Sequence, residues 1–155
     1  MTIQPGDKAP DFKLYNSDKK EVSSKDFEGR NVVIHFFPMA FTGTCTEQLC
    51  TLRDDLSSYK DMGAEVVGIS VDSPFTLAKY KEDQQYNFDL LSDFNKEVSQ
   101  QFGAYYEEFV MGLKGVSKRA AFVVDKSGTI RYAEVLENAG ELPDFQKIKD
   151  VLQEL

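Results

Sequence analysis

Two cysteines five residues apart are the side chains of this sequence best suited to covalent chemistry. They are Cys45 and Cys50. Residues 31–37, a short distance before them, are β-branched, aromatic or otherwise apolar at nearly every position, which predicts a buried strand. Pro38 ends that strand. The cysteines therefore follow a strand in the core of the protein.

A helix is expected to start just before Cys45 and to run to Tyr59, with Thr42 or Thr44 as its N-cap. Unpaired backbone N–H groups and the positive end of the helix dipole favour an anion in a first helical turn. Since the thiolate is the nucleophilic form of cysteine, this position predicts a reactive Cys45. The alternative is a small buried hydrophobic residue, a common environment for free cysteine.

The residues around Cys45 favour the reactive alternative. Pro38, Thr42 and Cys45 form the pattern Pro-x-x-x-Thr-x-x-Cys, which resembles the active-site signature of the peroxiredoxins, thiol-dependent peroxidases with a thioredoxin fold. The resemblance extends through most of the chain, including GDKAPDF at 6–12, VGISVDS at 67–73 and RAAFVVD at 119–125.

The resemblance implies a role for each matching residue. Cys45 resembles the peroxidatic cysteine, Thr42 the hydroxyl that positions peroxide, and Pro38 the ring that shields the sulfur. Arg119 resembles the guanidinium of the pocket, and Gln48 resembles a polar position that supports it. By residue type alone, an arginine before a strand such as 120–124 is expected on the solvated flank, so the role of Arg119 rests on the family.

Cys50 at this spacing is similar to the resolving cysteine of the bacterioferritin-comigratory, or PrxQ, group. Residues 36–43 look more like the one-cysteine group related to alkyl hydroperoxide reductase E. The resemblance thus implies either a Cys45–Cys50 disulfide or resolution by an external thiol. In an ideal helix the two Cα atoms are roughly 8 to 9 Å apart, beyond the about 7 Å that a disulfide spans, so bridging requires unwinding. Helical spacing also places Cys50 on the polar side, toward solvent.

The resemblance implies a peroxidase of antioxidant defence that reduces hydrogen peroxide or organic hydroperoxides. Its reductant would be a thioredoxin-like or glutaredoxin-like protein. Two other functions are a protein thiol–disulfide oxidoreductase, which also uses a helix-start cysteine, and a non-enzymatic holdase or scaffold. The one histidine, His35, lies in the buried strand and is expected to be a hydrogen-bonded core imidazole, without a role as catalytic base.

Length and composition exclude several classes of protein. The 155 residues predict one domain (1–155) with a core that needs no disulfide, and 41% hydrophobic and 28% charged residues argue against disorder or membrane embedding. A net charge of −8 without a basic stripe argues against nucleic acid. Two cysteines and one histidine are too few for a closed zinc site, so neither metal nor cofactor is expected. The start resembles no signal peptide and no apolar run approaches about 18 residues, which predicts a cytoplasmic protein without a membrane partner.

Strand-like and helix-like segments alternate along the chain. Residues 1–30 read as an extended section with one helical turn capped by Ser24. The expected strands are 12–15, 21–22, 65–70, 86–91, 120–124 and 129–134, and the expected further helices are 74–83, 97–102 and 143–155. This order predicts an α/β, thioredoxin-like fold: a central mixed sheet flanked by helices, with an N-terminal extension.

Residues 105–115 are rich in aromatic side chains and have no regular period, which predicts a loop. It could line the peroxide pocket, form a subunit contact or simply pack on the core. Together with Phe41 and Phe75 it could form an apolar patch around the active site, compatible with a monomer or a homodimer.

Overall fold

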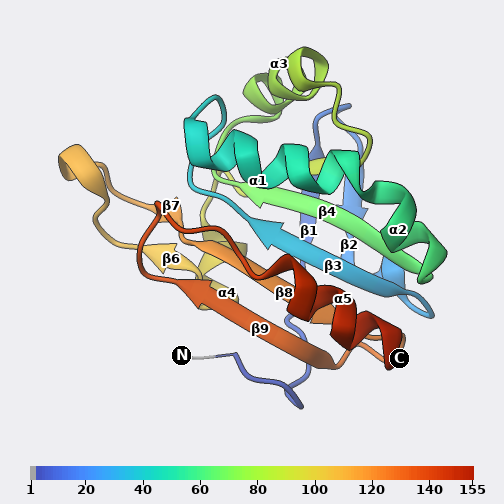
Figure 1. Cartoon of the computed structure of the whole chain (residues 1–155). Coiled ribbons are helices and arrows are strands. Elements are labelled where there is room, and N and C mark those ends of the chain that lie inside the picture. Colours follow the sequence, from blue (N-terminus) through green and yellow to red (C-terminus); the bar gives the residue numbers. More distant parts are fainter. Residues whose placement is uncertain (1–2) are drawn as a thin grey trace.

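A computed structural model describes residues 3–155, and its main feature is a seven-stranded mixed sheet (Figure 1). The strand order is β2-β1-β5-β4-β3-β8-β9. The strands are β1 (Lys13–Asn16), β2 (Glu21–Ser23), β3 (Asn31–Phe36), β4 (Ala64–Ser70), β5 (Asp89–Ser92), β8 (Arg119–Val124) and β9 (Ile130–Leu136). The predicted fold class, an α/β protein with a central mixed sheet, is confirmed.

Residues 3–155 also contain five α-helices and two short 3₁₀ helices, all but the last of them between strands. They are η1 (Ser24–Phe27), α1 (Gly43–Asp54), α2 (Leu56–Asp61), α3 (Pro74–Gln84), α4 (Glu97–Gln101), η2 (Val110–Gly112) and α5 (Phe145–Gln153). Helices α1 and α2 lie across β3 and β4, and α5 lies across β8 and β9 (Figure 1). Within residues 3–155, no helix is both long and apolar enough to cross a membrane.

Strand β3 lies inside the sheet, between β4 and β8, and is buried along its whole length. It runs parallel to β4, with α1 and α2 between them, and antiparallel to β8. Because successive side chains point to opposite faces of a strand, Val33 and Phe37 enter the core under α1, whereas Ile34 and Phe36 enter the core on the other face. His35 is on the α1 face by the same alternation.

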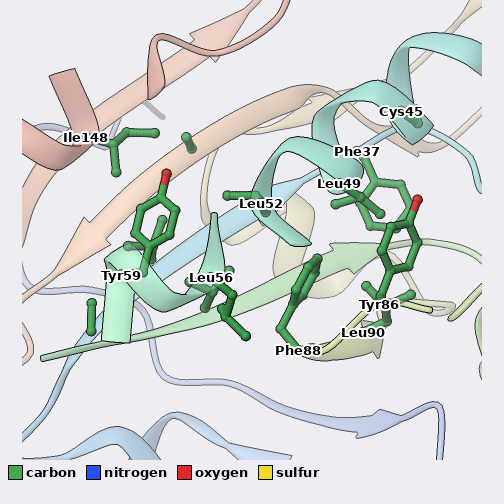
Figure 2. Packing of buried hydrophobic residues seen from close by; sticks show 14 of the residues in the cluster. Phe37, Cys45, Leu49, Leu52, Leu56, Tyr59, Tyr86, Phe88, Leu90 and Ile148 are labelled. Atoms are coloured by element: carbon green, nitrogen blue, oxygen red, sulfur yellow. The ribbon is translucent and has the colours of Figure 1, made fainter. Parts of the chain in front are cut away.

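The core under α1 holds the cysteine helix against the sheet. Figure 2 shows Leu49 and Leu52 on the side of α1 that faces Phe37, Phe88 and Leu90. Both leucines are fully buried, and the burial of each side chain stabilises the folded protein by about 2 kcal/mol. The start of α1 is thus fixed relative to the end of β3.

The cysteine helix is shorter than predicted. The sequence pattern suggested one helix to Tyr59, but α1 ends at Asp54 and α2 begins at Leu56. Asp55 between them leaves the helical conformation, and its carboxylate forms an ion pair with Lys149 of α5. Tyr59 is nevertheless buried, because α2 continues along β4.

Residues 105–115 are a loop for most of their length, as predicted, and two short paired strands hold its base. Two short strands, β6 (Tyr105–Tyr106) and β7 (Val116–Ser117), pair antiparallel, with η2 at the tip between them. Strands of two residues are too short to produce a period in the sequence, so the pairing at the base of this loop was not predicted.

Smaller differences concern the ends of elements. Ser23, not Ser24, is the cap residue of η1, in a capping box with Asp26. The expected strand 86–91 begins at Asp89, and α5 begins after its cap Asp144. The expected extended section at the start of the chain includes residues 1 and 2, which lie outside the residues described by the structure.

Candidate active site

Cys45 lies in the first turn of α1, as predicted, and its side chain is only 1% exposed. Thr42 is the residue before the helix, and its carbonyl oxygen accepts from the N–H of Thr46 at 2.9 Å. Thr42 is thus the N-cap, one of the two residues predicted for it, but its hydroxyl makes no capping hydrogen bond and donates to the carbonyl of Met39 at 2.8 Å. The first turn also lacks acidic residues. The positive end of the helix therefore has no side-chain anion of its own.

The turn between β3 and α1 is held by a carboxylate that sequence reasoning missed. The side chain of Asp72 accepts from the backbone N–H of Ala40 at 2.8 Å and from the hydroxyl of Ser70 at 2.7 Å. Pro38 is buried in this turn, and Phe41 adopts a left-handed conformation with φ of 67°. The available signal was the position of Asp72, just after β4, because β3 and β4 are parallel and end at the same edge of the sheet.

Arg119, the first residue of β8, is brought to Cys45 by the pairing of β8 with β3. The guanidinium is 2% exposed, and its Nη1 lies 3.3 Å from the sulfur of Cys45 and 2.8 Å from Oε1 of Gln48. Its Nε and Nη2 donate to the carbonyl of Ala139, at 3.2 and 2.7 Å. Within residues 3–155 none of its hydrogen bonds goes to a carboxylate.

A buried charge without a counter-ion is costly. Among the side chains that the Arg119 guanidinium contacts, the Cys45 sulfur is the one at which negative charge could be balanced. The structure thus brings Cys45, Gln48 and Arg119 together as the sequence predicted. The carbonyl of Ala139 could not have been found from residue patterns, because it is a backbone group in the segment after β9.

His35 is a core imidazole, as predicted. It is completely buried, stacks on the ring of Phe145 with centroids 5.8 Å apart, and its Nδ1 lies 2.9 Å from Nε2 of Gln48. Burial lowers the pKa of His35 from 6.5 to about 3, so the ring is neutral near pH 7.

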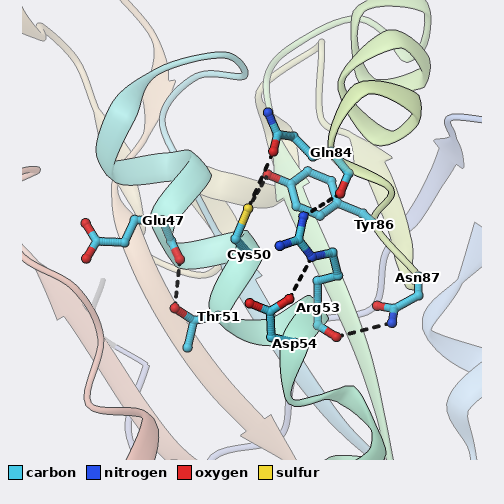
Figure 3. Close-up of polar contacts among 8 residues, drawn as sticks. All are labelled: Glu47, Cys50, Thr51, Arg53, Asp54, Gln84, Tyr86 and Asn87. Carbon is cyan, nitrogen blue, oxygen red and sulfur yellow. Dashed lines mark hydrogen bonds and ion pairs between the residues drawn. The ribbon is translucent and has the colours of Figure 1, made fainter.

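Cys50 is half-buried, so the prediction that it faces solvent is wrong. Figure 3 shows its sulfur directed toward the Oε1 of Gln84 and the hydroxyl of Tyr86, at 3.6 and 3.9 Å. Arg53 donates to the backbone carbonyl of Gln84, which holds Gln84 next to Cys50. The chain crosses over Cys50 here because the segment between α3 and β5 packs against α1, a contact between segments far apart in the sequence.

The aromatic residues near the site divide into two groups. Phe41 and Phe75 are exposed, and the ring of Phe41 lies 4.9 Å from that of Tyr80. In the β6–β7 hairpin, by contrast, Tyr106 makes a hydrogen bond: its hydroxyl donates to the carbonyl of Glu137 at 2.7 Å. The hairpin therefore supports the segment whose Ala139 carbonyl accepts from Arg119.

Comparisons with known proteins place this site in a family. The sequence profile of the AhpC/TSA family matches residues 5–133. The chain belongs to the AhpC/TSA family. It is 41% identical over 155 residues to the putative peroxiredoxin bcp of Haemophilus influenzae, covering 99% of this chain and 98% of the relative. It is also 44% identical over 134 residues to a putative peroxiredoxin of Mycobacterium tuberculosis, covering 85% of each chain.

Solved structures agree with the sequence comparisons. The crystal structure of peroxidoxin BcpB from Mycobacterium tuberculosis matches with a TM-score of 0.86 and 27% identity, over 99% of this chain and 98% of that chain. The fold is thus the thioredoxin-like fold of peroxiredoxins, and the enzyme is a peroxiredoxin, a thiol-dependent peroxidase similar to the Bcp and PrxQ group.

Proposed function

We propose that this peroxiredoxin reduces hydrogen peroxide or organic hydroperoxides with Cys45 as the peroxidatic thiolate. The observation that carries the proposal is the contact between Arg119 and Cys45: a buried guanidinium 3.3 Å from the sulfur, with no carboxylate among its hydrogen-bond partners within residues 3–155. The guanidinium is placed to stabilise negative charge on the sulfur, and the thiolate is the form that attacks peroxide.

In the first step the thiolate attacks one peroxide oxygen. The S–O bond forms as the O–O bond breaks, sulfur is oxidised to a sulfenic acid, and the other oxygen leaves as water or alcohol after taking up a proton. Negative charge moves from sulfur to the leaving oxygen, so donors fixed around both atoms lower the barrier. Arg119 and the backbone N–H groups at the start of α1 are these donors.

Thr42 and Pro38 position the substrate and protect the sulfur. Because the Thr42 hydroxyl gives its proton to the carbonyl of Met39, its oxygen is left as an acceptor for the proton of a hydroperoxide. Buried Pro38 limits access of water to the sulfur.

Cys50 then resolves the sulfenic acid. Its thiol attacks the Cys45 sulfur, the S–S bond forms and water leaves, before a second peroxide can oxidise Cys45 further. Both cysteines lie in the continuous helix α1, so their Cα atoms are roughly 8 to 9 Å apart and the first turns must unwind. A thioredoxin-like or glutaredoxin-like protein reduces the disulfide and closes the cycle.

The second candidate is that an external thiol, in place of Cys50, reacts with the sulfenic acid of Cys45. The contacts of Gln84 and Tyr86 with the Cys50 sulfur favour this candidate, because they hold Cys50 in place. General thiol–disulfide exchange with proteins fits less well, because Cys45 is too deeply buried to meet a large substrate while α1 is folded.

Peroxide consumption and mass spectrometry test the proposal together. We expect Cys45→Ser to abolish peroxide reduction, and one equivalent of peroxide to produce a Cys45–Cys50 linkage in the wild-type protein. A sulfenic acid at Cys45 without that linkage would point to the external thiol. Full peroxidase activity in Cys45→Ser would refute the assignment of Cys45.

A further inference from the structure

A chain of buried, hydrogen-bonded side chains connects His35 of strand β3 to the sulfur of Cys45. Nδ1 of His35 lies 2.9 Å from Nε2 of Gln48, and Oε1 of Gln48 lies 2.8 Å from Nη1 of Arg119. The same Nη1 is 3.3 Å from the sulfur of Cys45. All four side chains are buried, with at most 2% exposed.

The donors and acceptors along this chain have only one consistent direction. A guanidinium can only donate, so the Gln48 atom next to Arg119 is the carbonyl oxygen. The amide NH₂ of Gln48 therefore faces His35. Because that NH₂ can also only donate, Nδ1 of His35 must be an unprotonated acceptor, and the single proton of the neutral imidazole lies on Nε2.

We propose that His35 is a positioning residue of the peroxidase site: as the neutral Nε2–H imidazole, it fixes the Gln48 amide so that the carbonyl oxygen holds Arg119 against Cys45. The proposal rests on the proposed function in one respect, the role of Arg119 at the Cys45 thiolate. His35 itself touches neither substrate nor sulfur.

The surroundings of His35 support this role. Within residues 3–155 its Nε2 has no hydrogen-bond partner, although it is buried. The other tautomer would leave Nε2 as an unpaired acceptor and turn the Nδ1 proton toward the Gln48 NH₂, donor against donor. Both tautomers leave the buried Nε2 without a partner, which is unfavourable in either case, so the Gln48 NH₂ at Nδ1 decides which tautomer is present.

An apolar side chain at position 35 would weaken the alignment. The remaining acceptor for the Gln48 NH₂ is the carbonyl of Phe36, at a long 3.4 Å. With one poor acceptor the amide would also sample the flipped orientation, which sets its NH₂ against the guanidinium of Arg119. Each flip would release Arg119 from its position at the sulfur.

The tautomer can be observed directly in the reduced wild-type protein. Long-range ¹H–¹⁵N correlation spectra distinguish the two nitrogens of an imidazole, and assignment is immediate because the chain has one histidine. We expect the Nε2–H tautomer at pH 7. The Nδ1–H tautomer or a mixture would overturn the proposal, and this measurement requires no variant to fold.

Variants then test whether the hydrogen bond matters for the site. His35→Phe keeps an aromatic ring against Phe145 but removes the acceptor, whereas Asn in His35→Asn places an acceptor close to the position of Nδ1. In a Cys50→Ser background, we expect His35→Phe to slow oxidation of Cys45 by hydrogen peroxide about fivefold, the effect of losing one hydrogen bond between neutral groups. We expect His35→Asn to restore most of that rate, even though it leaves a cavity.

The controls separate this proposal from the proposed function. If His35 acts through Gln48, then adding His35→Phe to Gln48→Leu should cause no further loss of rate. Alkylation of Cys45 by iodoacetamide reports the thiolate without any peroxide chemistry, and thermal melting reports the fold. If the wild type and all variants reacted slowly with peroxide while His35 had the expected tautomer, the peroxidase role would be refuted. The alignment of Gln48 and Arg119 by His35 would still stand. An unchanged rate in folded His35→Phe would refute the positioning role alone.

Discussion

At the scale of single residues, the proposed chemistry depends on the guanidinium of Arg119. Its buried charge meets the Cys45 sulfur, the Gln48 carbonyl oxygen and the Ala139 carbonyl. The carbonyl oxygens of Gln48 and Ala139 fix the orientation of the planar guanidinium, so Nη1 already points at the sulfur before substrate binds. Preorganised donors of this kind require no rearrangement as charge moves in the transition state.

Thr42 offers a prediction that separates catalysis from stability. Since its hydroxyl does not cap α1, Thr42→Val should change the free energy of unfolding by less than about 0.5 kcal/mol. The same change should slow Cys45 oxidation about tenfold or more, because the peroxide loses an acceptor. Stopped-flow oxidation and urea unfolding measure the two effects.

Asp144→Ala is the matched control for Thr42→Val. Asp144 caps α5, accepting from the N–H of Lys147 at 3.1 Å, so its loss should cost about 1 kcal/mol of stability. It is not expected to affect Cys45 oxidation. A large loss of stability in Thr42→Val, with a normal rate, would reverse the roles assigned to these two residues.

His35 makes the stability of the protein depend on pH. Its pKa is lowered to about 3 in the folded protein by burial, against 6.5 for the ordinary side chain. Between these values the unfolded chain binds a proton that the folded protein excludes, so stability is complete above pH 6.5 and falls as pH decreases toward 3. At pH 5 the loss from this residue is about 2 kcal/mol.

Urea unfolding of the wild type and of His35→Phe at pH 7 and pH 5 checks this dependence. Other titrating groups are common to both proteins, so the wild type should lose about 2 kcal/mol more than the variant. An equal loss in the two proteins would mean that His35 is protonated in the folded state.

At the scale of elements, the proposed reaction cycle requires α1 to adopt two states. In the reduced state its first turn presents N–H groups to Cys45, and Leu49 and Leu52 hold it on the sheet. The hydroxyls of Thr46 and Tyr80, 2.8 Å apart, tie that turn to α3. A disulfide between Cys45 and Cys50 cannot form without breaking these contacts.

Oxidation should therefore unwind the first turns of α1. We expect amide exchange between residues 44 and 52 to accelerate in the disulfide form, and far-UV helicity to fall. The exchange of β8, which is paired on one side with β3 and on the other with β9, is the internal reference. Cys50→Ser treated with peroxide should keep its helix and over-oxidise more readily; protection of residues 44–52 in the disulfide form would exclude local unwinding.

At the scale of the whole molecule, the sheet brings together segments that are distant in the chain. The end of β3 and the start of α1 supply Pro38, Thr42 and Cys45, the start of β8 supplies Arg119, and the segment after β9 supplies the Ala139 carbonyl. The antiparallel pairing of β3 with β8 sets the distance between the first two groups. The β6–β7 hairpin supports the third through Tyr106 and Glu137.

Part of this arrangement could be predicted from the sequence. The apolar run at 31–37 and the Pro-x-x-x-Thr-x-x-Cys pattern indicated the strand, the helix start and the place of Cys45 in the first turn, because these features are local. Contacts that depend on tertiary packing could not be predicted: the cover of Tyr86 over Cys50, and the Asp72 carboxylate under the turn. The His35–Gln48 hydrogen bond joins two side chains that no periodic pattern relates.

The rate of Cys45 oxidation in Arg119→Lys tests the central claim most directly. Lysine keeps the positive charge but cannot bond Cys45, Gln48 and Ala139 with one planar group. With Cys50→Ser as background and hydrogen peroxide as substrate, we predict a fall in the second-order rate constant of about a hundredfold or more, in a protein that remains folded. A rate within about twofold of the parent would contradict the account, since charge alone would then suffice and the aligned guanidinium would have no part in the reaction.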